Sequence, residues 1–420
     1  MNINHLNIYR NKSSRLAAAM ASLLLLVAGG CVMDNEDCPV VDPDDGIVVT
    51  FELSGGIPAH TRVLEEEEGS EEESYIDIND LYIFTFEIGE GKTVADGDSK
   101  LMEILWSPNE DERLDRSVIT SSAGNAIWLR TFLNSNPNGN GTDPYKNDDG
   151  TYKNFCIVTV ANASKWLDGG ATSSGFIKGT TTLAALQKTL SYSKVLKNGS
   201  WVPGGKENPS WMPLFGIKRV KLDGYDPKTY NESNPYPLGT VWLLRALAKV
   251  EITTGADSGL TIESANVVGG GWNKDLSLIP FDSSTPKSLN CMENYAETGS
   301  TGQMARVPTF TSTAAGESET LSFSTEGNKA VVYLPEYNLQ NNRIVSIKFK
   351  ELPDYFPLNV SPYDANGNPV SGEDIWWKFI LRNYLYRFNI NGVTNNPLTL
   401  QINYTVCPMM TYETDIPEFQ

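Results

Sequence analysis

The stretch Leu398-Thr-Leu-Gln-Ile-Asn-Tyr-Thr-Val406 decides the fold class of this chain. Its apolar and polar residues alternate without a break, which is typical of a β-strand with one buried face and one face in solvent. The apolar positions that would share the buried face are Leu398, Leu400, Ile402, Tyr404 and Val406. The stretch therefore predicts an amphipathic strand.

Other short runs of the same kind recur along the chain. In residues 47–53, Val49, Phe51 and Leu53 alternate with polar neighbours and predict a half-buried strand. Further β-type runs lie at residues 81–88, 126–132, 155–160, 241–244, 250–253, 260–268, 330–334, 344–349 and 379–390. Turn-rich segments such as residues 134–141 separate them. This pattern predicts an all-β protein built from β-sandwiches.

Helical periodicity is scarce by comparison. It is clearest at residues 181–190, where Leu183, Leu186 and Leu190 would share one face and Thr181 is the expected N-cap. The polar, acidic residues 55–80 carry too much charge to pack and are expected to form an exposed loop. The sequence thus predicts few short helices.

The length of the chain favours two domains, because roughly 390 residues remain after an N-terminal signal. We expect a signal at residues 1–30, an acidic tether at 31–46, and sandwiches at 47–237 and 238–420. The Pro-rich stretch 225–237 is the candidate boundary between the two sandwiches.

The N-terminal segment has the features of an export signal. Basic residues Arg10, Lys12 and Arg15 precede an apolar run too short to span a membrane, which ends at Cys31. A Cys directly after Ala28-Gly-Gly30 resembles a bacterial lipoprotein signal, although Leu is more usual at position 28. We expect lipidation of Cys31. The alternative is an ordinary secretory signal in which this Cys is accidental.

Composition excludes several classes of function. The net charge of −19 and the pI near 4.6 disfavour nucleic acid as a partner. Only His5 and His60 are present, and His5 would leave with the signal, which argues against a multi-His metal centre or a Ser-His-Asp triad. No enzyme signature or cofactor motif is found, so we expect a non-enzyme without a cofactor. Trp376 and Trp377 leave open an alternative as a glycan-binding surface lipoprotein.

Four motifs resemble those of the Bacteroidota fimbrillins. They are Leu244-Arg-Ala-Leu-Ala-Lys-Val-Glu-Ile252, Val332-Tyr-Leu-Pro-Glu336, Leu381-Arg-Asn-Tyr-Leu-Tyr-Arg-Phe-Asn-Ile390 and the ending that starts at Val406-Cys-Pro-Met-Met. The resemblance implies two transthyretin-like Greek-key β-sandwich domains in tandem. It also implies a structural subunit of adhesive fimbriae at the outer membrane and cell surface, held there by the lipid at Cys31, with other fimbrial subunits as partners.

The resemblance further implies assembly by strand exchange. An Arg-specific protease would cut after Arg62, which lies between the first strand and the Glu-rich run 65–73. Flexible polar loops are where proteolytic nicking concentrates. The first strand would leave, and residues 398–406 of a neighbouring subunit would fill the vacated groove as donor strand. The alternative is that residues 398–406 are the last strand of their own domain.

Two departures leave the role within a fimbria open. Met409 follows Pro408 where the family commonly has Trp. The segment from Cys31 to Cys38 resembles the start of anchor subunits, which keep their lipid and are not cut. Cys38 could pair with Cys156 in the first domain, although four cysteines allow three connectivities. Shaft, tip and anchor roles are therefore not separated, and no adhesion receptor is identified.

Overall fold

The computed structural model describes residues 46–55, 67–68, 71–89, 95, 97–114, 116–122, 124–133, 143–163, 175–189, 191–192, 211–267, 276–277, 323–334, 337–338, 343–359, 379–380, 382–395 and 398–410. The chain divides into two units, Met1–Asp42 and Pro43–Gln420, and all described residues belong to the second. The predicted signal and the lipidation site Cys31 lie outside the described residues.

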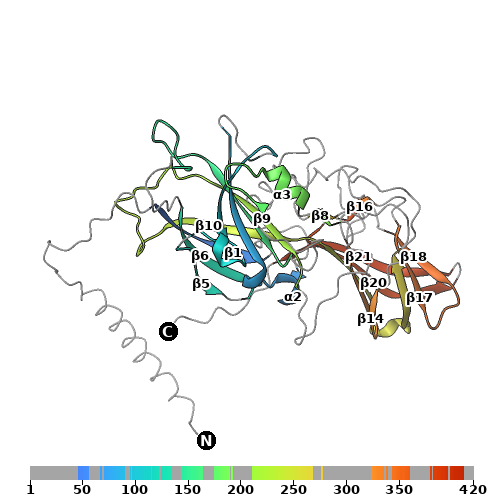
Figure 1. Ribbon diagram of the computed structural model, residues 1–420. Coiled ribbons are helices and arrows are strands. Elements are labelled where there is room, and N and C mark those ends of the chain that lie inside the picture. Colours follow the sequence, from blue (N-terminus) through green and yellow to red (C-terminus); the bar gives the residue numbers. More distant parts are fainter. Residues whose placement is uncertain are drawn as a thin grey trace, which may run out of the picture. The chain divides into compact units, whose positions relative to one another are not determined.

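The larger sheet has eight strands in the order β4-β3-β7-β9-β10-β1-β6-β5, of which Figure 1 labels β9, β10, β1, β6 and β5. These strands are β1 Ile47–Gly55, β3 Leu81–Glu87, β4 Leu101–Trp106, β5 Val118–Ser122, β6 Ala126–Leu133, β7 Phe155–Ala161, β9 Leu214–Val220 and β10 Tyr236–Arg245. β10 pairs along most of its length with β1, but it meets β9 only at Leu244 and Arg245. β10 therefore links two halves of the sheet, whose apolar side chains share one core cluster.

A second sheet of six strands has the order β14-β15-β11-β20-β21-β2. Its strands are β2 Glu67–Glu68, β11 Ala248–Thr254, β14 Ser324–Glu326, β15 Lys329–Leu334, β20 Tyr384–Asn395 and β21 Leu398–Met410. A three-stranded sheet contains β12 Ile262–Val267, β17 Arg343–Phe349 and β18 Tyr355–Asn359. Side chains such as Val250 and Phe388 of the six-stranded sheet and Ile347 and Phe349 of the three-stranded sheet belong to one core cluster. The strands thus form sheets that pack on a shared core, and the all-β prediction is confirmed.

Two small sheets complete the described β structure. β8 Ser191–Tyr192 pairs with β13 Leu276–Ser277, and β16 Tyr337–Asn338 pairs with β19 Phe379–Ile380. The predicted continuous strand at residues 379–390 is wrong, because the chain turns at Arg382 and Asn383 between β19 and β20. Asn383 has a φ of 61°, a left-handed conformation that Asn tolerates better than most residues.

The described helices are short, as expected. They are α2 Glu71–Ser74 and α3 Leu183–Thr189, with the 3-10 turns η1 Ile78–Asp80, η2 Glu110–Glu112 and η4 Ala256–Ser258. Leu183 and Leu186 of α3 are buried, but the expected cap at Thr181 is wrong. The hydroxyl of Thr182 accepts the Ala185 N–H at 3.2 Å, whereas that of Thr181 accepts the N–H of Ile177. Among the described residues, no helix combines the length and apolarity needed to cross a membrane.

The Pro-rich stretch 225–237 joins β9 to β10, two strands of the same sheet. The change from the eight-stranded to the six-stranded sheet comes later, between Arg245 at the end of β10 and Ala248 at the start of β11. The domain limits themselves stay a prediction.

Candidate functional site

β1 is an internal strand of the eight-stranded sheet. One edge pairs antiparallel with β6, from Ile47 opposite Leu133 to Ser54 opposite Ala126. The other edge pairs in parallel with β10 (Figure 1). The predicted inward residues Val49, Phe51 and Leu53 are all buried, as the alternation predicts. Loss of β1 would leave two unpaired strand edges and an apolar slot between them.

The end of β1 lies against α2. The N–H of Gly55 donates to the carbonyl of Asn125 at 2.8 Å. A Cβ atom at Gly55 would lie 2.3 Å from the carbonyl oxygen of Ser74, so only glycine fits this close approach without a shift of backbone. The chain therefore leaves β1 at Gly55 and returns to the same place at Ser74. Arg62, the predicted cleavage site, lies between them and outside the described residues.

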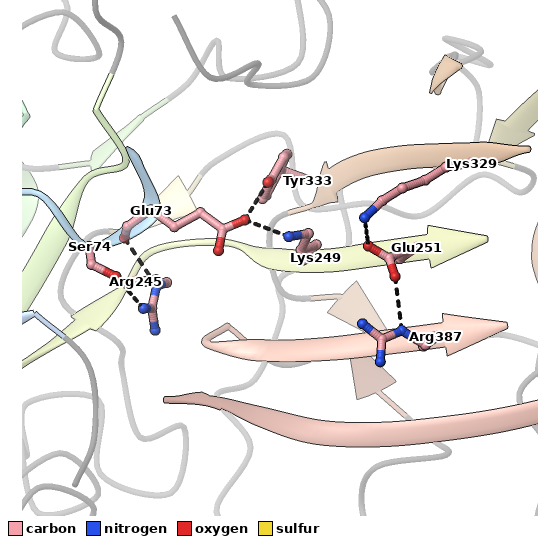
Figure 2. Close-up of polar contacts among 8 residues, drawn as sticks. All are labelled: Glu73, Ser74, Arg245, Lys249, Glu251, Lys329, Tyr333 and Arg387. Carbon is pink, nitrogen blue, oxygen red and sulfur yellow. Dashed lines mark hydrogen bonds and ion pairs between the residues drawn. The ribbon is translucent and has the colours of Figure 1, made fainter. Parts of the chain in front are cut away.

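Glu73 of α2 is fully buried and forms an ion pair with Lys249, with 2.9 Å between Oε1 and Nζ. The hydroxyl of Tyr333 donates to the same carboxylate oxygen. Lys249 lies on β11 and Tyr333 on the neighbouring strand β15, so the side chain of Glu73 points at the six-stranded sheet, as Figure 2 shows. A buried carboxylate is tolerated only with such partners.

Arg245, the last residue of β10, is also fully buried and binds the same helix from the other sheet. Its Nε donates to the carbonyl of Glu73 at 3.0 Å, and its Nη2 donates to the hydroxyl of Ser74 at 2.6 Å (Figure 2). Its Nη1 donates to Oδ1 of Asn383 at 3.0 Å. The N–H of Asn383 in turn donates to the carbonyl of Leu247 at 2.9 Å.

We call these residues the Glu73 cluster: Glu73, Ser74, Arg245, Lys249, Tyr333 and Asn383. The cluster joins α2 to the end of the eight-stranded sheet and to the start of the six-stranded sheet. Buried charge-assisted hydrogen bonds of this kind hold their elements in one geometry and are costly to break singly. The segment from Glu73 onward, which follows Arg62 in the sequence, is therefore firmly attached.

The electrostatics of the cluster favour a charged Glu73. Burial alone would raise its pKa, but the positive charges of Lys249 and Arg245 and the hydrogen bonds from Lys249 and Tyr333 outweigh burial, so the pKa lies below its usual value. Burial, and then the charge of Glu73, raises the pKa of Tyr333. Tyr333 thus stays a neutral donor to the charged carboxylate of Glu73.

A second polar group lies further along β11. Glu251 forms ion pairs with Lys329 at 2.5 Å and with Nε of Arg387 at 2.9 Å, from the strands on either side (Figure 2). Burial alone would raise the pKa of Glu251. The charges and hydrogen bonds of Lys329 and Arg387 outweigh burial, so the pKa lies below its usual value. This group ties β15, β11 and β20 together. Among the described residues, no set of His, Cys, Asp and Glu side chains is arranged to hold a metal ion.

The sequence did not predict the Glu73 cluster. Residues 55–80 were expected to form an exposed loop, which is wrong at Glu73, Ser74 and Ile76: these side chains are buried, and Glu73 and Ser74 belong to α2. The sequence nevertheless pointed to the other members of the cluster. Three of the four motifs that carry the fimbrillin resemblance contain them: Arg245, Lys249, Tyr333 and Asn383. These motifs, remote in sequence, meet in one cluster: Lys249 and Tyr333 bind the carboxylate of Glu73, and Asn383 binds Arg245.

The predicted donor strand forms part of β21. In this structure it pairs antiparallel with β20, from Leu398 opposite Asn395 to Pro408 opposite Tyr384, and then meets β2 at Met409 and Met410. Leu400 and Ile402 are half-buried against the core. The intervening residues are exposed: Thr399, Gln401 and Asn403. The side chains of Leu398, Tyr404 and Val406 lie outside the described residues, and exchange of this strand between subunits stays a prediction.

The remaining predicted sites are not assembled in the described part of the chain. Cys156 is buried in the core, and its pairing with Cys38 stays a prediction. Cys38, Trp376 and Trp377 lie outside the described residues.

Comparison with known proteins gives only remote likenesses. No family model and no curated protein matches the chain. Among solved structures, it is similar to the tip fimbrial protein Mfa3 of Porphyromonas gingivalis, with 8% identity, a TM-score of 0.44, and coverage of 86% of this chain and 99% of Mfa3. It is also similar to a fimbrial assembly protein of Parabacteroides distasonis, with 12% identity, a TM-score of 0.39, and coverage of 85% and 98%.

A third similar structure is the fimbrial anchor protein Mfa2 of Porphyromonas gingivalis, with 8% identity, a TM-score of 0.32, and coverage of 87% of this chain and 100% of Mfa2. These are fimbrial proteins, as the resemblance of the four motifs leads one to expect. Identities and TM-scores this low carry no argument about function.

Proposed function

We propose that this protein is a structural subunit of adhesive cell-surface fimbriae, exported as a lipoprotein through Cys31 and assembled by exchange of its first strand. The single observation that carries the proposal is the contrast on the two sides of Arg62. Before it, β1 is an internal strand held by pairing and apolar burial. After it, the chain is held by the Glu73 cluster. A cut at Arg62 would therefore separate β1 from a segment that stays in place.

The energetics of β1 favour replacement over simple loss. Its buried apolar residues are Ile47, Val48, Val49, Phe51 and Leu53. Burial of five such side chains contributes roughly 8–12 kcal/mol before entropy losses. An empty groove would be strongly unfavourable, so a strand with the same alternation would be taken up in its place. Residues 398–406 of a second subunit have that alternation.

Strand exchange requires that β21 leave β20, on which it lies in this structure. Edge strands are more readily released than internal ones, because one of their two edges has fewer backbone partners to lose. Within the described residues, β21 pairs on its outer side only with the two residues of β2. This arrangement supports β21 over β1 as the strand that is free to move before cleavage.

The experiment is limited digestion of the mature protein with an Arg-specific protease. We expect a new N-terminus at Val63, followed by ladders of high mass on gels. The variant Arg62→Ala should remain uncut and monomeric. The matched control Arg116→Ala removes a partly exposed Arg elsewhere and should be cut at Arg62 like the natural protein.

Two other outcomes would replace the proposal. Assembled fimbriae that contain an intact chain from Cys31 would assign the non-cleaved anchor role. A protein that stays intact and monomeric under digestion and is retained on a glycan column would assign glycan binding.

A further inference from the structure

We propose that a cationic pocket in the fork between β9 and β10 binds an acidic peptide in an extended conformation. The fork arises because β10 meets β9 only at Leu244 and Arg245 and pairs with β1 toward its start. A pocket of about 350 Å³ lies in the opening, lined by residues 218–221 of β9 and its end and by 236–238 of β10.

Positive charge dominates this pocket in a protein whose net charge is −19. Lys218 is half-buried and Lys221 is exposed, and in the described part of the chain neither forms an ion pair. Arg219 adds a third cation to the lining. Lys218 and Lys221, which have no carboxylate partner among the described residues, attract anions from solution, because the walls of a concave site focus their field.

The kink of β10 places Lys218 in the fork. Gly239 has a φ of 75°, and a Cβ atom there would lie 3.8 Å from Nζ of Lys218. The register between β1 and β10 shifts at the same place, between the pairs Thr50 with Pro237 and Glu52 with Thr240. β10 therefore bends away from β9 where the ammonium group of Lys218 lies, and the opening is built into the backbone.

The backbone around the pocket favours a peptide as ligand. Lys218, Arg219 and Val220 pair with β7 along one edge, and in the described residues their other edge pairs with no strand. An extended peptide can hydrogen-bond such an edge, while its side chains provide specificity. Carboxylates of the peptide would bind Lys218 and Lys221. An acidic run like residues 65–68 of another copy has the required chemistry.

This site does not depend on strand exchange. β10 faces β1 with one edge and the fork with the other, so the pocket exists before any cut at Arg62. Binding should therefore be the same in the natural protein and in Arg62→Ala. Failure of one proposal leaves the other standing.

The test is fluorescence anisotropy with the labelled peptide Val-Leu-Glu-Glu-Glu-Glu-Gly-Ser and a matched peptide in which Gln replaces each Glu. We expect the acidic peptide alone to bind, with an affinity that falls as salt is added. The double variant Lys218→Gln, Lys221→Gln should bind about tenfold more weakly, since each partly exposed ion pair contributes about 0.7 kcal/mol.

The control is Lys178→Gln, Lys350→Gln, which makes the same charge change at exposed lysines away from the pocket and should bind normally. Thermal melts verify that each variant is folded, and Lys221→Gln alone repeats the test at an exposed position. Equal binding of both peptides, or an equal loss in the control, would overturn the proposal. Displacement of the peptide by oligogalacturonate or sulfate at the same charge concentration would show that the site takes any anion and not a peptide.

Discussion

The carboxylate of Glu73 and the ammonium group of Lys249 lie 2.9 Å apart, and the side chain of Glu73 has no exposure to solvent. Glu73 belongs to α2, and Lys249 belongs to β11 of the six-stranded sheet. This pair, with Arg245 on its other side, attaches α2, which follows Arg62 in the sequence, to both large sheets. In the proposed assembly, α2 and the chain that follows it would stay in place, while β1 would leave.

Removal of the Glu73 carboxylate should destabilise the protein strongly. In Glu73→Ala the buried charge of Arg245 and the largely buried charge of Lys249 lose their compensation, so the free energy of unfolding should fall by about 3–5 kcal/mol. Urea denaturation measures the change. Glu232→Ala breaks exposed ion pairs with Arg116 and Arg130 and should cost less than about 1 kcal/mol. Equal losses in the two variants would contradict the role given to the cluster.

The stability of the protein should depend on the ionisation of Glu73 at acid pH. Its folded pKa lies below the ordinary value of 4.5, so its contribution is fully present above pH 4.5 and is lost as the pH falls through the lower folded pKa. In Glu73→Gln this contribution is absent at every pH. The difference in free energy of unfolding between the two proteins should therefore narrow below pH 4.5. A constant difference down to pH 2 would contradict the assignment.

The close approach of β1 to α2 predicts a steric effect at Gly55. In Gly55→Ala the new Cβ would meet the carbonyl oxygen of Ser74 at 2.3 Å, so backbone must shift and the free energy of unfolding should fall by about 1–3 kcal/mol. Gly175→Ala is the matched control, because no atom of the described residues, its chain neighbours aside, lies within 4 Å of its Cβ position. Its free energy of unfolding should change by less than about 0.5 kcal/mol. The idea fails if Gly55→Ala is as stable as the control.

Apolar burial should determine how tightly β1 is held. Leu53→Ala removes a fully buried side chain and should lower the free energy of unfolding by about 2–5 kcal/mol. After a cut at Arg62, the strand of this variant should also dissociate faster, as measured by mass spectrometry of the retained fragment. The control Val118→Ala, at an exposed position of β5, should change neither quantity. Unchanged release from Leu53→Ala would mean that pairing alone retains β1.

The alternation of single segments predicted many strands correctly. Val49, Phe51 and Leu53 are buried in β1, and Leu400 and Ile402 of β21 are more buried than their exposed neighbours. This success has a local cause, since successive side chains of a strand point to opposite faces. The turn at Asn383 between β19 and β20 could not be predicted in this way, because a turn inside an apolar run leaves the composition of the run unchanged.

The Glu73 cluster illustrates what local pattern cannot supply. A run of glutamates predicts exposure, and for a charge without partners that prediction is right. Glu73 is buried because Arg245, Lys249 and Tyr333 are brought to it from far along the chain, Arg245 from 172 residues away. The motifs contain these residues, but the spacing of the motifs along the sequence does not predict that the residues lie together.

The sequence by itself determined the all-β class and the identity of most strands, because a period of two residues needs only neighbouring positions to be recognised. Only the tertiary structure decided that β1 is internal, that β10 forks away from β9, and that three separate motifs meet in the Glu73 cluster. Strand order, sheet edges and buried ion pairs depend on contacts between distant residues, and those contacts are selected by the free energy of the whole packed chain.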